Sequence, residues 1–285
     1  MSKDLTFSKS IFCDPANEIC IAAVQMRAGP EVFVNLKEAA RLIDIAVTKG
    51  AKLVALPEYF CIMGMRDSDK VVLREEEGSG PIQDFLSKTA KSHGIWLVGG
   101  SVPLVSSRPD KVKNSCLVYD DSGKQVARYD KIHLFNLKSG EEHYAEEETI
   151  EAGTNVVTLE SPFGRIGLSI CYDLRFPELY RSMEKVDIIL APSAFTSFTG
   201  KAHWEVLVRA RAIENMAYMI APAQSGRHIN GNETYGDSMI VDPWGVILDH
   251  LPKGPGVVLA NINRSYQKNL QNSLPALKHR TLHFC

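Results

Sequence analysis

The chain has 285 residues, of which 45% are hydrophobic and 23% charged, a composition that excludes a disordered or fibrous protein and allows one large domain or two ordinary ones. The net charge of −2 and the scattered basic residues give no reason to expect nucleic acid or an anionic membrane as a partner. Because no apolar stretch is long enough to cross a bilayer and the first residues, MSKDLTFSKS, are polar, we expect a cytoplasmic protein.

In the first half of the chain, short apolar runs alternate with amphipathic stretches. In chain order these predict a strand at 20–26, a helix at 35–49, a strand at 52–56, a helix at 81–93 and a strand at 95–102. The segments 114–119 and 124–130, separated by Asp-Asp-Ser-Gly, predict a β-hairpin.

The second half continues the same alternation. It predicts a strand at 165–170, a helix after Pro177, a strand at 187–191, a helix at 203–217, and strands at 218–223, 236–241, 245–249 and 256–262. Continuous apolar strands that alternate with helices indicate sheets covered by helices, which is the α/β class. The number of strands favours two sheets packed together with helices outside.

No internal repeat or low-complexity linker divides the chain. We therefore expect one domain over 20–262, an N-terminal extension at 1–19, and a C-terminal helix and tail at 263–285. The six cysteines are too few and too widely spread for a disulfide framework, and no C-x-x-C pair supports a zinc site. No metal or organic cofactor is expected.

Three predicted strands end in a chemically reactive side chain: KLVALP is followed by Glu58, QVARYD by Lys131, and RIGLSI by Cys171. Taken singly, each residue is most simply structural, since such a glutamate caps a helix, a lysine is solvated and a cysteine packs in the core. Polar groups at strand ends are nevertheless where α/β folds place function. An acid, a cation and a thiol at three strand ends together favour a catalytic site.

A thiol at Cys171 needs an activating partner, because a free cysteine with a pKa of about 8.5 is only a few per cent thiolate at neutral pH. Glu58 could accept the proton, and the charge of Lys131 could favour an anion. The residues after Cys171 predict a tight turn into a helix, which leaves the backbone N–H of Tyr172 free to face a developing oxyanion.

These motifs resemble those of the nitrilase superfamily of carbon–nitrogen hydrolases. The resemblance runs from about Ile21 to the LKHR segment and is carried by LPEYF, YDKIHLF and ICYDLRFPE. It implies a four-layer α-β-β-α sandwich and assigns the catalytic glutamate, lysine and cysteine to Glu58, Lys131 and Cys171. Hydrolysis of a carboxamide through an acyl-enzyme is the implied activity.

The superfamily also has a second catalytic glutamate, between the lysine and cysteine motifs. In this chain the segment SGEEHYAEEET offers five candidates. The family's Tyr-x-Glu pattern favours Glu146, while Glu141, Glu142, Glu147 and Glu148 remain alternatives that would otherwise be surface charges.

Within the superfamily, the segments PSAFTSFTGKAHWE, AQSGRH and YGDSMIVDPWG are most similar to the branch called Nit, or deaminated-glutathione amidase. That branch hydrolyses deaminated glutathione to 2-oxoglutarate and cysteinylglycine. The alternatives are an ω-amidase that acts on 2-oxoglutaramate or 2-oxosuccinamate, another amidase, a carbamoylase or nitrilase, and a non-catalytic scaffold. One departure is Asp237, which stands where relatives have histidine and would repel a substrate carboxylate if it faced the pocket.

The resemblance also suggests which residues bind the substrate. Arg175 suits a substrate carboxylate, although an ion pair that holds the loop is an equal alternative. The expected binding residues are Tyr172, Arg175, Phe195, Thr196 and Arg227.

Three further expectations concern neighbouring segments. His228 is expected to serve its loop without contacting substrate, and Cys61 is expected to pack rather than react. A helix is expected to open at His203, Trp204 and Glu205, with Arg209, Arg211 and Glu214 in surface or interface ion pairs. The family also implies a homodimer or higher homo-oligomer that pairs through surface helices and the segment 263–285; a small amide is the other partner.

Overall fold

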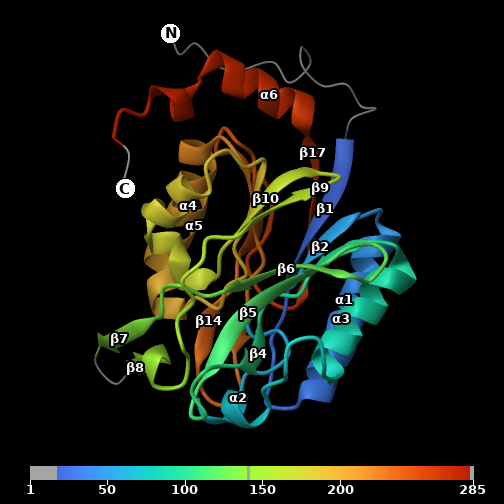
Figure 1. The fold of residues 1–285 in the computed structure, drawn as a ribbon, viewed down its shortest axis with the longest axis vertical. Coiled ribbons are helices and arrows are strands. Elements are labelled where there is room, and N and C mark those ends of the chain that lie inside the picture. The colour runs from blue at the N-terminus through green and yellow to red at the C-terminus, as the bar shows by residue number, and fades with distance from the viewer. Residues whose placement is uncertain (1–17, 140–141, 283–285) are drawn as a thin grey trace.

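The computed structural model describes residues 18–139 and 142–282, so nearly all of the N-terminal extension predicted at 1–19 lies outside the described residues. Two β-sheets face each other at the centre of the molecule (Figure 1). In spatial order the first contains β17 (Gly256–Asn263), β1 (Glu18–Gln25), β2 (Leu53–Ala55), β3 (Trp96–Val98), β5 (Val112–Tyr119) and β4 (Val102–Val105), with β6 (Gln125–Asp130) also paired to β5. The second contains β16 (Ile247–Leu251), β15 (Ser238–Val241), β12 (Tyr218–Ala221), β11 (Ile188–Leu190), β10 (Gly164–Leu168) and β9 (Thr158–Ser161).

The sequence of β1 shows why these strands are apolar throughout. Successive side chains of a strand point to opposite faces of its sheet. Ile21 and Ala23 belong to the apolar cluster that also holds the second sheet, whereas Ala22 and Val24 belong to a cluster shared with the outer helices. Both faces of the sheet are thus buried, and a strand in this position must be apolar at every residue.

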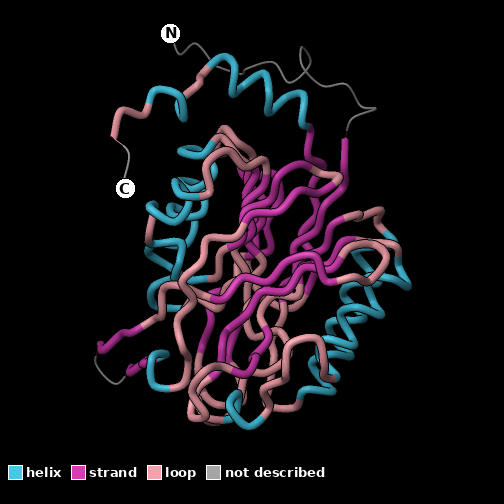
Figure 2. Tube along the Cα trace, in the orientation of Figure 1, coloured by secondary structure: helices cyan, strands magenta, loops and turns pink. Residues whose placement is uncertain are grey.

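Helices cover the outer face of each sheet. α1 (Val32–Thr48) and α3 (Pro81–His93) lie on the first sheet, and α4 (Pro177–Ser182) and α5 (Ser197–Asn215) on the second, as Figure 2 shows with strands between two helical layers. The predicted four-layer α-β-β-α sandwich is therefore confirmed. α6 (Arg264–Ser273) follows β17 in the segment predicted to be helical. Among the residues that the structure describes, no helix is long and apolar enough to span a membrane.

The hairpin predicted at 114–119 and 124–130 is confirmed, since β5 and β6 pair antiparallel. The strand predicted at 95–102 is wrong, because the chain forms two strands, β3 and β4, with a turn between them. Gly100 in that turn has φ +52°, and a Cβ there would lie 2.1 Å from the carbonyl oxygen of Pro57. A side chain at this position would displace the loop that carries Glu58, so the turn positions a site residue.

The helix predicted at 203–217 begins earlier than expected, at Ser197, and ends at Asn215. Thr196 is its N-cap and accepts a hydrogen bond from the backbone N–H of Thr199 at 3.2 Å. Gly200 precedes the predicted start at 203 but lies inside the helix, which packs closely on Tyr235, where a Cβ at this position would approach to 2.3 Å. His203, Trp204 and Glu205 therefore lie within the helix rather than at its start.

Both arginines form ion pairs on this helix, as predicted, but only that of Arg209 lies on the surface. Arg209 pairs with Glu205 at 2.9 Å on the exposed side. Arg211 is buried, and its guanidinium donates to the carbonyl oxygen of Leu174 at 2.7 and 2.9 Å and to Glu214 at 2.7 Å. Arg211 thus holds the segment that follows Cys171 against α5.

Candidate active site

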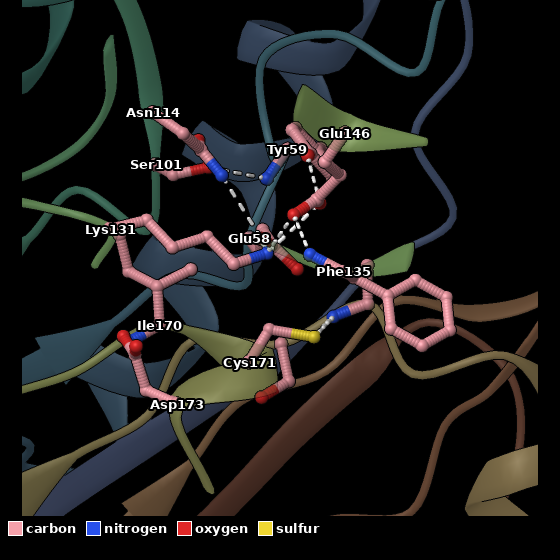
Figure 3. A network of polar contacts seen from close by, with 12 residues as sticks. Glu58, Tyr59, Ser101, Asn114, Lys131, Phe135, Glu146, Ile170, Cys171 and Asp173 are labelled. Carbon is pink, nitrogen blue, oxygen red and sulfur yellow. Dashed lines mark hydrogen bonds and ion pairs between the residues drawn. The ribbon is translucent and has the colours of Figure 1, made fainter. Parts of the chain in front are cut away.

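The three reactive strand ends meet at one place, between the ends of the two sheets. Glu58 follows β2 and Lys131 follows β6 in the first sheet, while Cys171 follows β10 in the second. Figure 3 shows their side chains converging. All three side chains are buried, and Glu58 and Cys171 line an open cleft with about 830 Å³ of free space counted out to its mouth.

Cys171 lies on a sharp turn at the end of β10. Its backbone has φ +49°, a conformation that residues other than glycine rarely adopt, and the 3-10 helix Cys171–Arg175 begins there. The Cys171 N–H donates to Pro192 O at 2.9 Å, and its Sγ accepts a hydrogen bond from the backbone N–H of Ala194 at 3.5 Å. The turn presents the sulfur to the cleft rather than to the core.

The Glu58 carboxylate is held by one of its oxygens and leaves the other without a partner. Oε1 accepts from Lys131 Nζ at 2.9 Å and from Asn114 Nδ2 at 3.0 Å. Oε2 is buried and has no hydrogen-bond partner among the described residues. A buried carboxylate oxygen without a hydrogen-bond partner lowers the stability of a fold. Its presence beside the Cys171 thiol indicates that Glu58 Oε2 is the acceptor of the thiol proton.

The ammonium of Lys131 lies between two carboxylates. Nζ contacts Glu58 Oε1 at 2.9 Å and the two oxygens of Glu146 at 2.9 and 2.8 Å. Burial alone disfavours the charged amine, but the charges of Glu146 and Glu58 outweigh it and raise the pKa of Lys131 well above its usual value. Lys131 is therefore a permanent cation in this site.

Glu146 is the glutamate of the acidic segment that the structure places in the site. It lies at the start of the 3-10 helix Glu146–Glu148, after the small hairpin formed by β7 (Asn136–Ser139) and β8 (Glu142–Ala145). Its Oε2 also accepts from the Phe135 N–H at 2.8 Å. Glu147 and Glu148 are exposed. Glu141, and the side chain of Glu142, lie outside what the structure describes.

Tyr59 is a site residue that the sequence analysis missed. Its backbone has φ +56°, its N–H donates to Ser101 Oγ at 2.9 Å, and its hydroxyl donates to Glu146 Oε1 at 2.7 Å (Figure 3). Burial, with the nearby Glu146 charge, raises the pKa of Tyr59 well above its usual value, so the phenol remains a donor. Its position next to Glu58 in LPEYF was the available signal.

Asp173 is a second missed residue, and it joins two of the strand ends. It is fully buried, and its Oδ2 accepts from the Ile170 N–H at 2.8 Å and from the Tyr129 hydroxyl at 2.7 Å. Its Oδ1 accepts from the His133 N–H at 3.0 Å and lies 2.7 Å from His133 Nδ1. Asp173 thereby fixes the turn of Cys171 against the segment that carries Lys131.

The pKa values of the thiol and the acids define the resting state. Burial, and then the charge of Glu58, raise the pKa of Cys171 well above its usual value, so the thiol is neutral at rest. Burial also raises the pKa of Glu58, although Lys131 opposes that shift. Burial opposes ionisation of Glu146 too, but Lys131 dominates there and lowers its pKa. The site thus holds a neutral thiol beside a carboxylate of raised basicity.

A smaller hollow, with about 210 Å³ of free space, adjoins the cleft and shares Cys171 with it. Four of the five expected substrate-binding residues line it, namely Tyr172, Arg175, Phe195 and Thr196. The Arg175 guanidinium carbon lies 5.7 Å from the Tyr172 ring centre and 5.6 Å from that of Phe195. Nη1 and Nη2 of the guanidinium each lie 3.2 Å from His203 Nδ1. Among the described residues, Arg175 forms no ion pair with a carboxylate.

The fifth residue, Arg227, does not lie with them. It ends β13 (Ser225–Arg227), which pairs with β14 (Glu233–Tyr235), and its exposed side chain lines neither cavity. His228 beside it is buried between Ala28 O and Thr234 Oγ1, each at 2.8 Å, as a loop role requires.

Asp237 does not face the cleft either. It lines neither cavity, and its Oδ1 lies 2.7 Å from His250 Nδ1. Its backbone carbonyl accepts from the indole N–H of Trp204 at 2.7 Å. Asp237 therefore places no charge on the wall of either cavity. Cys61 is fully buried and lines neither cavity, as packing requires.

Comparison with known proteins places this arrangement in a family. The carbon–nitrogen hydrolase family model matches residues 20–271. The deaminated glutathione amidase of Synechocystis sp. (strain PCC 6803 / GT-S) is 42% identical over 265 residues, which are 91% of this chain and 97% of that protein. The crystal structure of the C. elegans NitFhit protein superposes with a TM-score of 0.87 at 36% identity over 93% of this chain and 65% of that one. Saccharomyces cerevisiae Nit3, a member of branch 10 of the nitrilase superfamily, superposes with a TM-score of 0.84 at 29% identity, covering 93% and 97% of the two chains.

Proposed function

Because this chain belongs to the carbon–nitrogen hydrolase family and is an amidase, we propose that its substrate is deaminated glutathione, which it cleaves to 2-oxoglutarate and cysteinylglycine. The observation that carries the proposal is a buried thiol, carboxylate and ammonium around one cleft, flanked by a hollow that holds an arginine. A relative at 42% identity, which covers nearly the whole chain, bears that activity in its name.

In the proposed first step, Cys171 Sγ attacks the amide carbon while its proton passes to Glu58. The carbonyl oxygen becomes an oxyanion, stabilised by the Lys131 ammonium and by the Tyr172 N–H, which lies in the first turn of a 3-10 helix where no intrahelical acceptor exists. The C–N bond then breaks, and Glu58 returns the proton to the departing nitrogen. The products of this step are a thioester on Cys171 and a free amine.

The second step reverses these roles with water. Glu58 takes a proton from water as the hydroxide attacks the thioester carbon, and the same donors hold the oxyanion. The C–S bond breaks, the acid leaves, and Glu58 protonates the thiolate. One carboxylate thus acts as base and acid twice, which suits the raised pKa of Glu58. Glu146 keeps Lys131 charged and in place.

The position of Glu58 also orients the substrate. Glu58 lines the larger cleft and not the smaller hollow, so a nitrogen that receives its proton must face the larger cleft. The acyl chain then enters the smaller hollow, where Arg175 meets its carboxylate. In deaminated glutathione the acyl part is a five-carbon keto acid and the amine part is a dipeptide, which fits a small and a large compartment.

Replacing Glu58 with glutamine should lower kcat/KM by about 10²- to 10⁴-fold, because the isosteric amide cannot accept the thiol proton. In the unaltered enzyme, kcat/KM should fall as the pH drops through the pKa of Glu58, which burial holds above 4.5, since only the carboxylate form accepts the proton. Profiles of kcat/KM from about pH 4 to 8 should lose this acid limb in E58Q. An E58Q variant with an unchanged rate and the same acid limb would remove Glu58 from the proposed chemistry.

The substrate is tested with a panel of amides and analysis of products. We expect kcat/KM for release of cysteinylglycine from deaminated glutathione to exceed that for ammonia release from 2-oxoglutaramate by about tenfold or more, because the larger compartment is filled only by the peptide. The reverse order would favour the ω-amidase alternative, with 2-oxoglutaramate or 2-oxosuccinamate as substrate. If neither substrate were turned over, the substrate would be a different amide that the same catalytic groups hydrolyse.

Two further proposals concern the setting of the enzyme. Cytoplasmic residence is supported by the free thiols of Cys20, Cys61, Cys116 and Cys171, which a reducing compartment maintains. A homo-oligomer that pairs through α5 is supported by exposed apolar side chains on that helix and on the adjoining turn: Phe198, Val206, Ile213, Trp244 and Val246.

A further inference from the structure

Lys70 is a lysine on the wall of the larger cleft that the proposed chemistry does not use. It lies on the short helix α2 (Asp69–Val72), and only 13% of its side chain is exposed. Its Nζ lies 5.3 Å from the centre of the Tyr59 ring and 3.8 Å from Asp67 Oδ1, and it makes no hydrogen bond with any residue that the structure describes. This largely covered ammonium thus has only a long ion pair and a ring contact, and its hydrogen-bond donors are unused among the described residues.

We propose that Lys70 binds the terminal carboxylate of the peptide that leaves when the amide is cleaved. This inference rests on the proposed function and names the part of the site that recognises the leaving group. The ligand class is an amide whose amine part is a short peptide with a free C-terminal carboxylate.

The geometry of the cleft supports this placement. The leaving nitrogen faces Glu58. Tyr59, the next residue, connects the catalytic groups to Lys70, since its hydroxyl contacts Glu146 and its ring lies under the Lys70 ammonium. The charge of Lys70 also acts on Glu146, whose pKa it helps to lower. Two extended residues span about 7 Å, so a dipeptide that begins at the scissile nitrogen reaches past one aromatic ring. Its carboxylate then lies at Lys70, and its backbone passes over Tyr59.

The charges around Lys70 confine the carboxylate to this side of the cleft. Arg66, also on the cleft, is mostly exposed and lies 3.5 Å from Asp69, so it adds positive charge only at the rim. Asp67 lies on the same wall as Lys70 but is mostly exposed and only distantly paired. Glu233 lines the cleft from β14 and repels an anion there. Lys70 is therefore the covered cation available to a buried carboxylate.

This arrangement lets the enzyme separate two kinds of amide. A primary amide such as 2-oxoglutaramate releases ammonia, leaves the Lys70 side of the cleft empty, and gains nothing from the lysine. A peptide amide fills the cleft and gains a charge-assisted hydrogen bond. Lys70 thus acts as a specificity residue that favours peptide amides.

The test is a cycle of one substitution in the enzyme and one in the substrate. The substrates are deaminated glutathione and its analogue in which the glycine carboxylate is a carboxamide. In the unaltered enzyme we expect the carboxamide to lower kcat/KM about tenfold, mainly through KM. In Lys70→Gln we expect deaminated glutathione to be impaired by a similar factor and the carboxamide to cause less than about a twofold further loss.

Two variants make the result specific. Lys70→Arg keeps the positive charge and should retain a clear penalty for the carboxamide. Lys88→Gln removes an exposed lysine of α3 that pairs with Asp84, and should show the full tenfold penalty. A full penalty that persists in a folded Lys70→Gln, or no penalty in the unaltered enzyme, overturns the inference while leaving the proposed function standing. Failure of the unaltered enzyme to release cysteinylglycine at all overturns the proposed function itself.

Discussion

Replacing Cys171 with alanine should lower kcat/KM by at least about 10⁴-fold, because the variant has no nucleophile and the remaining oxyanion donors act on water alone. The fold should persist. The change removes one sulfur atom, which accepts a long hydrogen bond from the backbone N–H of Ala194. We expect the free energy of unfolding to change by less than about 1.5 kcal/mol.

The matched control for this variant is Cys116→Ala. Cys116 lies on β5, is as deeply buried as any cysteine that the structure describes, and lines neither cavity. Burial raises the pKa of Cys116 to about 12, so it holds no thiolate at neutral pH. Its loss should leave kcat/KM within about threefold of the unaltered enzyme. Steady-state rates and urea unfolding curves of both variants test the prediction. A folded C171A protein that retains the rate of the unaltered enzyme would show that Cys171 is not the nucleophile.

Replacing Lys131 with methionine should have the second largest effect, on stability and on activity together. The substitution leaves the carboxylates of Glu58 and Glu146 facing each other in a buried site with no cation between them. Removal of one partner from a buried ion pair costs about 3 to 5 kcal/mol, which is a large part of the stability of an ordinary domain. Loss of an oxyanion donor and of the alignment of Glu58 should lower kcat by at least about 10³-fold.

The pH dependence of this loss follows from the carboxylates. Without Lys131, burial and mutual repulsion hold their folded pKa values above the unfolded ones. The protonated forms are then favoured by folding, so the deficit is smallest at acid pH and grows as the pH rises through the raised values. A Lys131→Met/Glu146→Gln double variant should regain part of the free energy of unfolding but none of the activity. A single variant as stable as the unaltered protein at pH 7 would contradict the buried network.

Much of the fold could be predicted because both faces of each sheet are buried, which makes the strands continuous apolar runs. The errors arose where packing overrides local signals. Gly99 and Gly100 extended an apolar run, yet Gly100 turns against Pro57 and ends the strand. Gly200 looked like a helix boundary, yet it lies inside α5 because Tyr235 packs on it.

The site divides in a similar way. The positions of Glu58, Lys131 and Cys171 at the ends of strands could be predicted, since strand ends follow from hydrophobic patterning. The roles of Asn114, Asp173 and Lys70 could not be predicted, because a single polar residue in a strand or a short helix has no periodic pattern that indicates which group it contacts. Each acquires its role only when the chain folds: Asn114 meets Glu58 within the first sheet, Asp173 meets Tyr129 of the other sheet, and Lys70 lies over the Tyr59 ring.

The central claim is that the acyl group of the substrate is carried on Cys171, and rapid acid quenching tests it most directly. The enzyme is mixed with a small excess of deaminated glutathione and quenched with acid at times shorter than one turnover. It is then digested at low pH, and the masses of its peptides are measured by mass spectrometry. We predict a 2-oxoglutaryl thioester on the peptide that contains Cys171, which rises before free 2-oxoglutarate and is absent from C171A. Product formation with no acyl group on Cys171 at any time, or an acyl group on another residue, would contradict the account.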